Sequence, residues 1–276
     1  MDKIVIRSYR GAKPIDWHDL KRYKDLLYFM VLRDVTVVYK QTVMGFAWAI
    51  VNPLISMLVF TIVFGKLAGV TSDGIPYPLF SFSALVPWTY FSNAMNASSS
   101  SLISSSSLLG KVYFPRIYIP LTPALSKLVD FSISFLVLLV FLFIYKQTPD
   151  VEILAMPLLI LLLVATVAGM GFWFSSLAVQ YRDVRFAISF LTPLLMYAAP
   201  VVFPASLVME KAGYNIYLLY GLYPMTGVIE GFRGALLEEK AVPWDLLSVS
   251  ALSATFILLT GWHFFRRTER YFADVA

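Results

Sequence analysis

The chain has 276 residues, of which 59% are hydrophobic and 14% are charged, and its mean hydropathy is +0.73. A soluble domain usually carries about 25% charged residues, so this composition excludes an ordinary soluble enzyme and indicates several membrane spans. The net charge of +5 comes from Lys and Arg in segments that flank apolar runs, which argues against a nucleic-acid-binding protein.

The N-terminal 45 residues are charged and predict an amphipathic helix before the first membrane span. Pro14 and Asp16 are typical of a helix start. Apolar side chains then recur at helical spacing, at Trp17, Leu20, Tyr23, Leu27 and Met30. The helix either packs on its own protein or lies in the membrane interface, and the apolar run that follows favours the interface.

The stretch at 33–53, RDVTVVYKQTVMGFAWAIVNP, passes from charged residues through Met44 and Gly45 to Trp48. Trp favours the headgroup level of a membrane, and Lys and Arg favour its cytoplasmic side. We therefore expect a surface helix that turns into the bilayer, with Met44 and Gly45 as the joint between that helix and the first span.

Six apolar stretches are long enough to cross a bilayer core, which needs about 20 residues. They cover approximately 46–66, 80–103, 124–145, 153–178, 186–208 and 246–265. With the N-terminus inside, the cytoplasmic segments hold 17 Lys and Arg and the external segments hold five. The six stretches predict six spans at 46–265 within a single domain. The charge asymmetry predicts that the N-terminal segment 1–45 and the tail 266–276 are cytoplasmic.

Aromatic side chains lie beside prolines in two of these spans. Trp88, Tyr90 and Phe91 follow Pro87, and Tyr197 lies between Pro193 and Pro200. A buried Tyr hydroxyl needs a partner, which a water-filled channel supplies, so we expect these aromatics to line a conduit. Packing between helices is the alternative, as it is for the serines at 98–101 and 104–107, which either allow close helix packing or line a wet path.

The loop LLGKVYFPRIYIP at 108–120 is apolar although it is short and cytoplasmic. Large apolar side chains in such a loop suggest a docking surface for another protein. The residues expected to dock are Leu109, Lys111, Tyr113, Phe114 and Arg116. Just beyond them, Lys127 and Asp130 stand three residues apart, a spacing that favours an ion pair over a proton relay.

The external segment 209–245 is apolar but interrupted by Gly221, Pro224 and Gly227. The pieces on either side of Pro224 are too short to span, so they are expected to be re-entrant or interfacial helices. Glu230 and Arg233 are spaced to pair on the second piece.

Motifs for catalysis are missing from the sequence. There is no Walker A, HExxH or GxSxG pattern, no His cluster and no Cys. An integral-membrane acyl- or glycosyltransferase would need acid or base residues gathered near one membrane face, and none gather here. The chain is therefore expected not to be an enzyme, and an energised transporter of this kind would take its energy from a partner.

Several motifs together resemble the membrane subunit of polysaccharide ABC exporters, of the type-2 ABC permease family, whose members export lipid-linked O antigen, capsule or teichoic acid. The motifs are Arg33-Asp34, Met44-Gly45, Pro87-Trp88-Thr89-Tyr90-Phe91, Lys111 to Arg116, and Pro200-Val201-Val202-Phe203-Pro204. The resemblance continues through Glu230 and Arg233 to the tail. Two departures are Met44 in place of a usual Leu, and Tyr223 before Pro224 in place of a frequent Asn.

The resemblance implies an all-α homodimer of six-span subunits in the cytoplasmic membrane, with two separate ATPase subunits that hold ATP and Mg²⁺. This chain itself would bind no cofactor and no metal. The segment around 17–31 would be a gate helix, and residues around 105–116 would couple to the ATPase. Re-entrant helices with Tyr223, Pro224, Glu230 and Arg233 would cap the external face. The channel would conduct an undecaprenyl-linked glycan, and the resemblance favours O antigen; a teichoic-acid, capsule, drug or small-lipid exporter is the alternative.

Overall fold

The computed structural model describes residues 21–40, 45, 47–109, 114–238, 240–269 and 272, apart from the side chains at 108 and 109. Within these residues the regular structure is entirely helical, which confirms the predicted all-α class. The first helices are α2 (Lys24–Lys40), α3 (Ala47–Phe60) with its π-helical continuation η1 (Thr61–Leu67), α4 (Tyr77–Ser104) and α5 (Ser106–Leu109). They are followed by α6 (Tyr118–Ile144), a 3₁₀ turn η2 (Val151–Ala155), α7 (Met156–Gln180) and α8 (Asp183–Ala198). The last four are α9 (Ser206–Ala212), α10 (Tyr214–Tyr220), α11 (Pro224–Leu236) and α12 (Trp244–Thr268).

Four helical segments of the described chain are long and apolar enough to cross a membrane. They are Ala47–Leu67, Tyr118–Ile144, Val151–Gln180 and Trp244–Thr268. These agree with the first, third, fourth and sixth predicted spans. The fifth predicted span, 186–208, is not one helix, because α8 ends at Ala198 and the chain is irregular before α9. Pro200 and Pro204 lie in that irregular segment. Because proline has no backbone N–H, neither residue can donate the hydrogen bond that would continue a helix.

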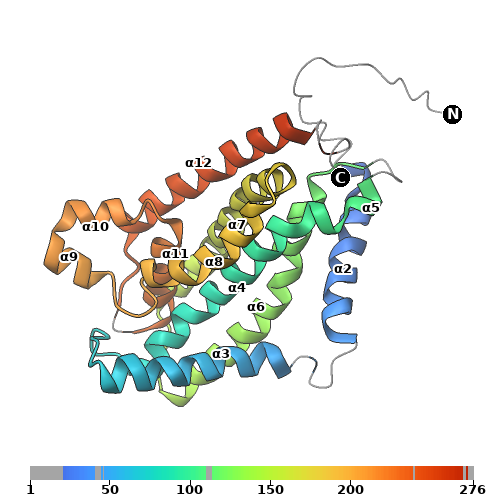
Figure 1. The fold of residues 1–276 in the computed structure, drawn as a ribbon. Helices are drawn as coiled ribbons and strands as arrows, with labels where there is room; N and C mark the ends of the chain where they lie inside the picture. The colour runs from blue at the N-terminus through green and yellow to red at the C-terminus, as the bar shows by residue number, and fades with distance from the viewer. Residues whose placement is uncertain are drawn as a thin grey trace.

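The second predicted span corresponds to α4, the helix at the centre of the bundle (Figure 1). It packs against α3, α6, α7, α8 and α11, and most of its residues are buried. Because protein surrounds it, α4 carries Ser and Tyr side chains that a helix facing lipid would not. Its buried hydroxyls mostly bond back to their own helix, as when Ser83 donates to the Phe80 carbonyl at 2.9 Å.

The helices α7 and α12 approach each other closely because glycines face each other at their contact. A Cβ atom added to Gly261 would lie 2.3 Å from the carbonyl oxygen of Gly169. Only a residue without a side chain fits at this separation, which is the small-residue packing typical of helices in membranes. Trp173 of α7 stacks on Phe264 of α12 beside this contact, with ring centroids 4.3 Å apart.

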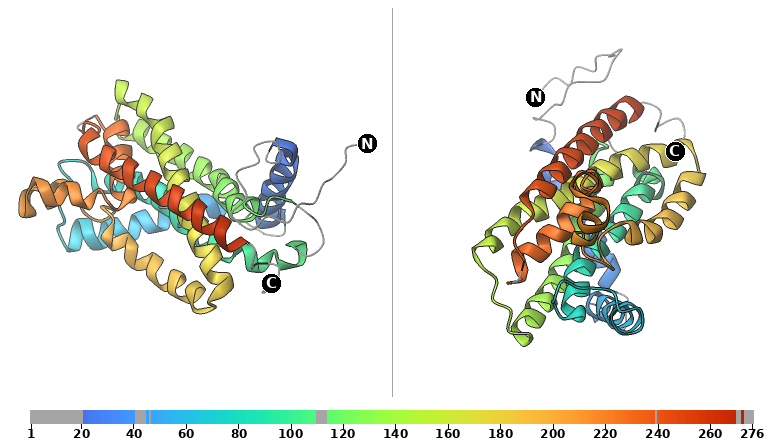
Figure 2. Two further views of the ribbon diagram at one scale, coloured as in Figure 1. Left: turned by 90° about the horizontal axis from the view of Figure 1, so that it is seen from above. Right: turned by 90° about the vertical axis from the view of Figure 1, so that its left-hand side faces the viewer.

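The two ends of the bundle carry different helices (Figures 1 and 2). The helices α2 and α5 lie at one end, and α9 and α10 lie at the other. Towards the α9 and α10 end, α11 is inserted so deeply that all of its residues are buried, against α4, α7, α12 and η2. Pro224 begins α11, as its position in the sequence predicts, and Tyr223 before it makes no side-chain cap.

Candidate functional site

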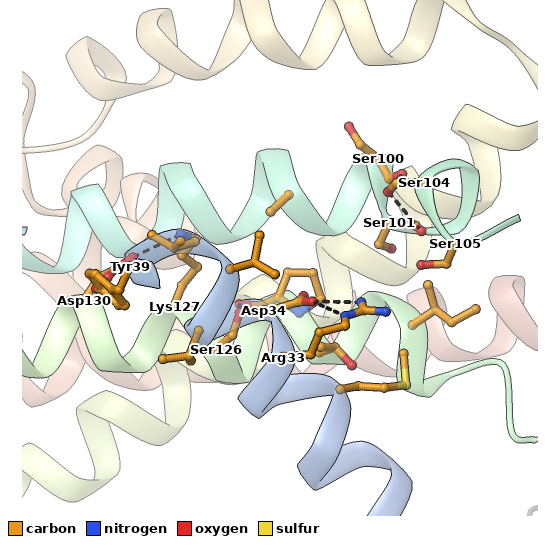
Figure 3. Close-up of a pocket in the computed structure, with 18 residues that line it drawn as sticks. Arg33, Asp34, Tyr39, Ser100, Ser101, Ser104, Ser105, Ser126, Lys127 and Asp130 are labelled. Atoms are coloured by element: carbon orange, nitrogen blue, oxygen red, sulfur yellow. Dashed lines mark hydrogen bonds and ion pairs between the residues drawn. The ribbon is translucent and has the colours of Figure 1, made fainter. Parts of the chain in front are cut away.

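A cavity of about 500 Å³ lies where α2 crosses α4 and α6 (Figure 3). Arg33, Asp34 and Tyr39 reach it from α2, and Lys127 and Asp130 reach it from α6. A row of hydroxyls lines the α4 side, including Ser100, Ser101 and Ser104. Sequence spacing does not predict this cavity, because its α2 wall comes from a segment that is distant in the chain from the α4 and α6 walls.

The charged residues of the cavity are joined in pairs. Arg33 binds Asp34 at 2.8 Å, and Lys127 binds Asp130 at 3.0 Å, as predicted for the second pair. The Tyr39 hydroxyl donates to the other oxygen of the Asp130 carboxylate. Asp130 therefore connects α6 to α2, and its carboxylate balances the positive charge of the half-buried Lys127. This network fits a structural ion pair, the interpretation favoured from the sequence.

The helix α2 docks on the bundle through the stripe that was predicted for it. Met30 is buried, and Tyr23 and Leu27 pack beside it against an apolar group that we name the Phe114 cluster. The buried members of the cluster are Met30, Leu102, Phe114, Ile117, Tyr118, Ile119, Ala168, Phe172, Phe265 and Phe272. The opposite side of α2 exposes Tyr28 and Phe29, so the helix presents apolar surface on both sides. Trp17, Leu20 and Met44 lie outside the described residues.

Gly45 lies between α2 and α3 and has a φ angle of +47°. Such a left-handed conformation favours glycine over residues with a Cβ atom. Gly45 is thus the described part of the joint that the sequence predicted between the surface helix and the first span.

The segment predicted to dock on a partner is only partly described. Lys111 and Tyr113 lie outside the described residues, as does the Leu109 side chain. Phe114 is only 7% exposed and is buried in its own chain, so it does not form an apolar docking surface here. Arg116 donates to the Glu269 carbonyl oxygen at 2.6 Å, which ties the segment to the end of α12. Both side chains hold the segment in place.

Three of the four aromatics expected in a conduit are inside the subunit. Trp88, Tyr90 and Phe91 are each at most 4% exposed. The Tyr90 hydroxyl finds its partner in the Ala124 carbonyl oxygen of α6, at 2.7 Å, rather than in water. Within the single chain these three residues therefore pack between helices, which was the alternative. Tyr197 is different, since it is 52% exposed on α8.

At the opposite end of the bundle, four ionised residues form what we name the Arg233 cluster: Asp73, Glu230, Arg233 and Lys240. Arg233 binds Glu230 at 2.7 Å, as predicted, and Lys240 bridges Glu230 and Asp73 at 3.3 and 2.7 Å. The sequence reasoning missed two residues of the cluster, Asp73 and Lys240. Asp73 is remote in the chain, and Lys240 lies beyond the end of α11, so helical spacing gives no signal for either.

The Arg233 cluster also holds backbone. Arg233 is fully buried, stacks on the Phe80 ring at 3.6 Å and donates to the carbonyl oxygens of Phe80 and Val201 at 3.3 and 3.2 Å. Glu230 accepts from the Ala205 amide at 3.0 Å. The cluster thus joins α11 to the start of α4 and to the irregular segment between α8 and α9. Nearby, exposed Tyr214 donates to Asp245 at 3.0 Å, and this hydrogen bond raises the pKa of the Tyr214 hydroxyl.

Comparisons with known proteins agree with this architecture. The chain is similar to a Myxococcus xanthus protein named O-antigen export system permease protein RfbA, with 26% identity over 255 residues, which are 92% of this chain and 96% of that protein. A Klebsiella pneumoniae protein of the same name is 26% identical over 252 residues, 91% of this chain and 95% of that protein. An Escherichia coli protein named polysialic acid transport protein KpsM is 22% identical over 248 residues, 87% of this chain and 92% of that protein.

Residues 25–237 match the family described as ABC-2 type transporter. The match runs from α2 through the last buried turn of α11, so it includes the cavity and three of the four residues of the Arg233 cluster, all but Lys240. Together with its apolar membrane-length helices, this match shows that the chain is a multi-pass membrane protein that belongs to the ABC-2 type transporter family.

Proposed function

We propose that this chain is the permease subunit of an ATP-driven exporter that moves a lipid-linked polysaccharide, most simply O antigen, across the cytoplasmic membrane. The observation that carries the proposal is the alignment with proteins named O-antigen export permeases over more than 90% of this chain and of theirs. Because the alignment spans more than 90% of both sequences, it supports a common architecture over nearly all of the aligned chain.

The proposed membrane arrangement has six spans in one domain, 1–276, with both termini in the cytoplasm. It counts α4 and α8 with the four apolar spans. The 28 residues of α4 extend for about 42 Å, more than the roughly 30 Å of a bilayer core. The α8 helix continues into the irregular segment 199–205, which protein covers at Ala199, Val201 and Ala205. Irregular backbone at membrane depth is tolerated where protein surrounds it.

In this arrangement α2 is a gate helix at the cytoplasmic entrance, and α10 and α11 are re-entrant helices at the external face. The apolar side chains that α2 exposes away from the bundle support an interfacial position, because lipid can cover them. The complete burial of α11 supports a re-entrant helix, since a short helix at membrane depth must be enclosed by protein.

The energy would come from two ATPase subunits that bind ATP and Mg²⁺ and act on a homodimer of this chain, which itself holds no cofactor. The Phe114 cluster supports a route for that energy. It contains Phe114 of the segment proposed to contact the ATPase and Met30 of the proposed gate helix. Because the two segments pack in one cluster, a displacement of the ATPase-contacting segment would displace the gate helix as well.

The glycan, carried on an undecaprenyl lipid, would pass along a conduit between the two subunits. Tyr197 supports a conduit along α8, because its ring is exposed and α8 also exposes Phe186 and Phe190. Flat aromatic faces suit passing sugar rings, while Trp88, Tyr90 and Phe91 stiffen the bundle behind them. A conduit needs weak repeated contacts, since tight binding would halt export.

The test is to delete the gene for this chain in its own cell and to follow surface glycan and lipid-linked glycan inside the cell. We expect surface glycan to disappear and the lipid-linked form to accumulate, and we expect the reintroduced gene to restore export only with its active ATPase. Unchanged surface glycan together with lost dye efflux would instead favour a drug or small-lipid exporter. The similarity to the polysialic acid transport protein makes a capsule the second candidate, which the chemical identity of the lost glycan decides.

A further inference from the structure

The cavity between α2, α4 and α6 has the dimensions and the lining of a binding site. Its volume of about 500 Å³ falls within the 300–1,000 Å³ usual for small-molecule sites. Its walls combine apolar residues, such as Val38, Ile119 and Pro123, with hydroxyls and paired charges. An amphipathic lining of this kind suits a ligand that has both apolar faces and polar groups around its edge.

The charges of the cavity discriminate against an anion. The lining holds two cations and two anions, and each cation already binds a carboxylate. A phosphate or carboxylate ligand would have to displace Asp34 from Arg33 or Asp130 from Lys127. The second displacement would also remove the carboxylate to which Tyr39 donates. A ligand without net charge can bind without displacing either carboxylate from its cation.

The hydroxyls of the cavity act mainly as acceptors. Ser100 donates its hydrogen to the Asn96 carbonyl oxygen at 3.3 Å, and Ser104 donates to the Ser100 carbonyl oxygen at 2.8 Å. On the α6 wall, Thr122 and Ser126 donate likewise within their helix, at 2.7 and 3.3 Å. A hydroxyl that has donated its one hydrogen keeps lone pairs, so it can still accept from a ligand.

A wall of acceptors selects a ligand that is rich in donors. An anion presents acceptors to acceptors, whereas each hydroxyl of a sugar can donate. The CH groups of a sugar ring can meanwhile lie on the apolar residues. We infer that this cavity binds a neutral sugar ring and holds one end of the glycan beside α2 before export. The inference rests on the proposed function only for the source of the ring.

The chain has no Cys, so one introduced Cys can report occupation of the cavity. Ala97 lines the cavity but offers no side-chain hydrogen bond, so Ala97→Cys places a thiol there without removing an acceptor. The full-length permease in lipid nanodiscs is treated with N-ethylmaleimide in the presence of maltotriose or of inorganic pyrophosphate. Ser107→Cys is the control, because Ser107 is exposed on α5 and does not line the cavity.

We expect maltotriose to slow alkylation of Ala97→Cys several-fold and to leave Ser107→Cys unchanged, while pyrophosphate protects neither. Adding Ser100→Ala and Ser104→Ala to Ala97→Cys should abolish the protection, whereas adding Ser107→Ala should not. A helix tolerates these changes, because back-bonded Ser is slightly unfavourable in a helix.

Protection by pyrophosphate alone, protection by neither compound, or equal protection of the control would each overturn the inference. So would protection that persists without Ser100 and Ser104. The result is separate from the proposed function: sugar protection without cellular glycan export would refute the function and keep the site. Normal export without protection would do the reverse.

Discussion

Removing the charge of Arg233 should destabilise the protein strongly. Arg233→Met keeps the length of the side chain but leaves the Phe80 and Val201 carbonyl oxygens without their charged donor. Breaking a buried ion pair typically costs about 3–5 kcal/mol. Glu230 would still bind Lys240 and the Ala205 amide, so we expect the lower end of that range, about 3 kcal/mol. Glu230→Leu should cost more, towards about 5 kcal/mol, because it leaves a fully buried guanidinium without its carboxylate.

The measurement is the apparent melting temperature of the full chain in detergent, read as the fraction that remains monodisperse after heating. A loss of about 3 kcal/mol corresponds to roughly 10 °C for a protein of this size. The matched control is Lys211→Met, because Lys211 is exposed and forms no ion pair among the described residues. Its effect should stay within about 0.5 kcal/mol.

The double variant Glu230→Leu/Arg233→Met tests the electrostatic reasoning itself. It removes both buried charges together, so it should be less damaging than Glu230→Leu alone. If Arg233→Met melted with the unaltered protein, or if the double variant lost the sum of both single losses, the cluster would not be the buried ion pair that holds this end of the bundle.

Four further outcomes are expected. Lys211→Cys should react with an impermeant maleimide added outside intact cells and Arg267→Cys should not; the opposite pattern would reverse the proposed orientation. Gly261→Ala should cost about 1–3 kcal/mol, read as a lower melting temperature, because its Cβ atom would overlap the Gly169 carbonyl oxygen; an unchanged melting temperature would refute the close contact. Tyr197→Ala should lower glycan export while dimer yield and melting temperature stay unchanged, and normal export would remove Tyr197 from the conduit. Asp130→Asn should speed hydrogen exchange in α2, since Asn cannot neutralise Lys127 or hold Tyr39 as strongly; unchanged exchange would show that this contact does not hold α2.

Local patterns in the sequence predicted the features that depend on neighbouring residues. Lys127 with Asp130, and Glu230 with Arg233, stand one helical turn apart and form pairs as expected. The apolar runs located the four membrane-length helices, because length and hydropathy decide whether a helix can cross a bilayer.

Features that depend on distant contacts could not be read in the same way. Lys240 meets Asp73, and the cavity joins α2 to α4 and α6, across separations that no periodicity records. The same holds for burial. Phe114 was expected on an exposed docking loop and Tyr90 in a channel, but both side chains are buried in contacts with distant parts of the chain. For α4, hydropathy did not predict that the helix is enclosed by protein. Most of its serines face other helices and its own backbone rather than lipid.

The depth at which α11 is buried has a consequence for biogenesis. More than a hundred residues are synthesised between the end of α4 and the start of α11, which takes on the order of ten seconds at 5–20 residues per second. During that interval α4 lacks one of the helices that later pack against it, and the Phe80 carbonyl oxygen lacks Arg233. The bundle therefore cannot complete its packing span by span as it enters the membrane. Until α11 arrives, the surface of α4 that it covers faces the insertion machinery or lipid, which acts as a temporary packing partner.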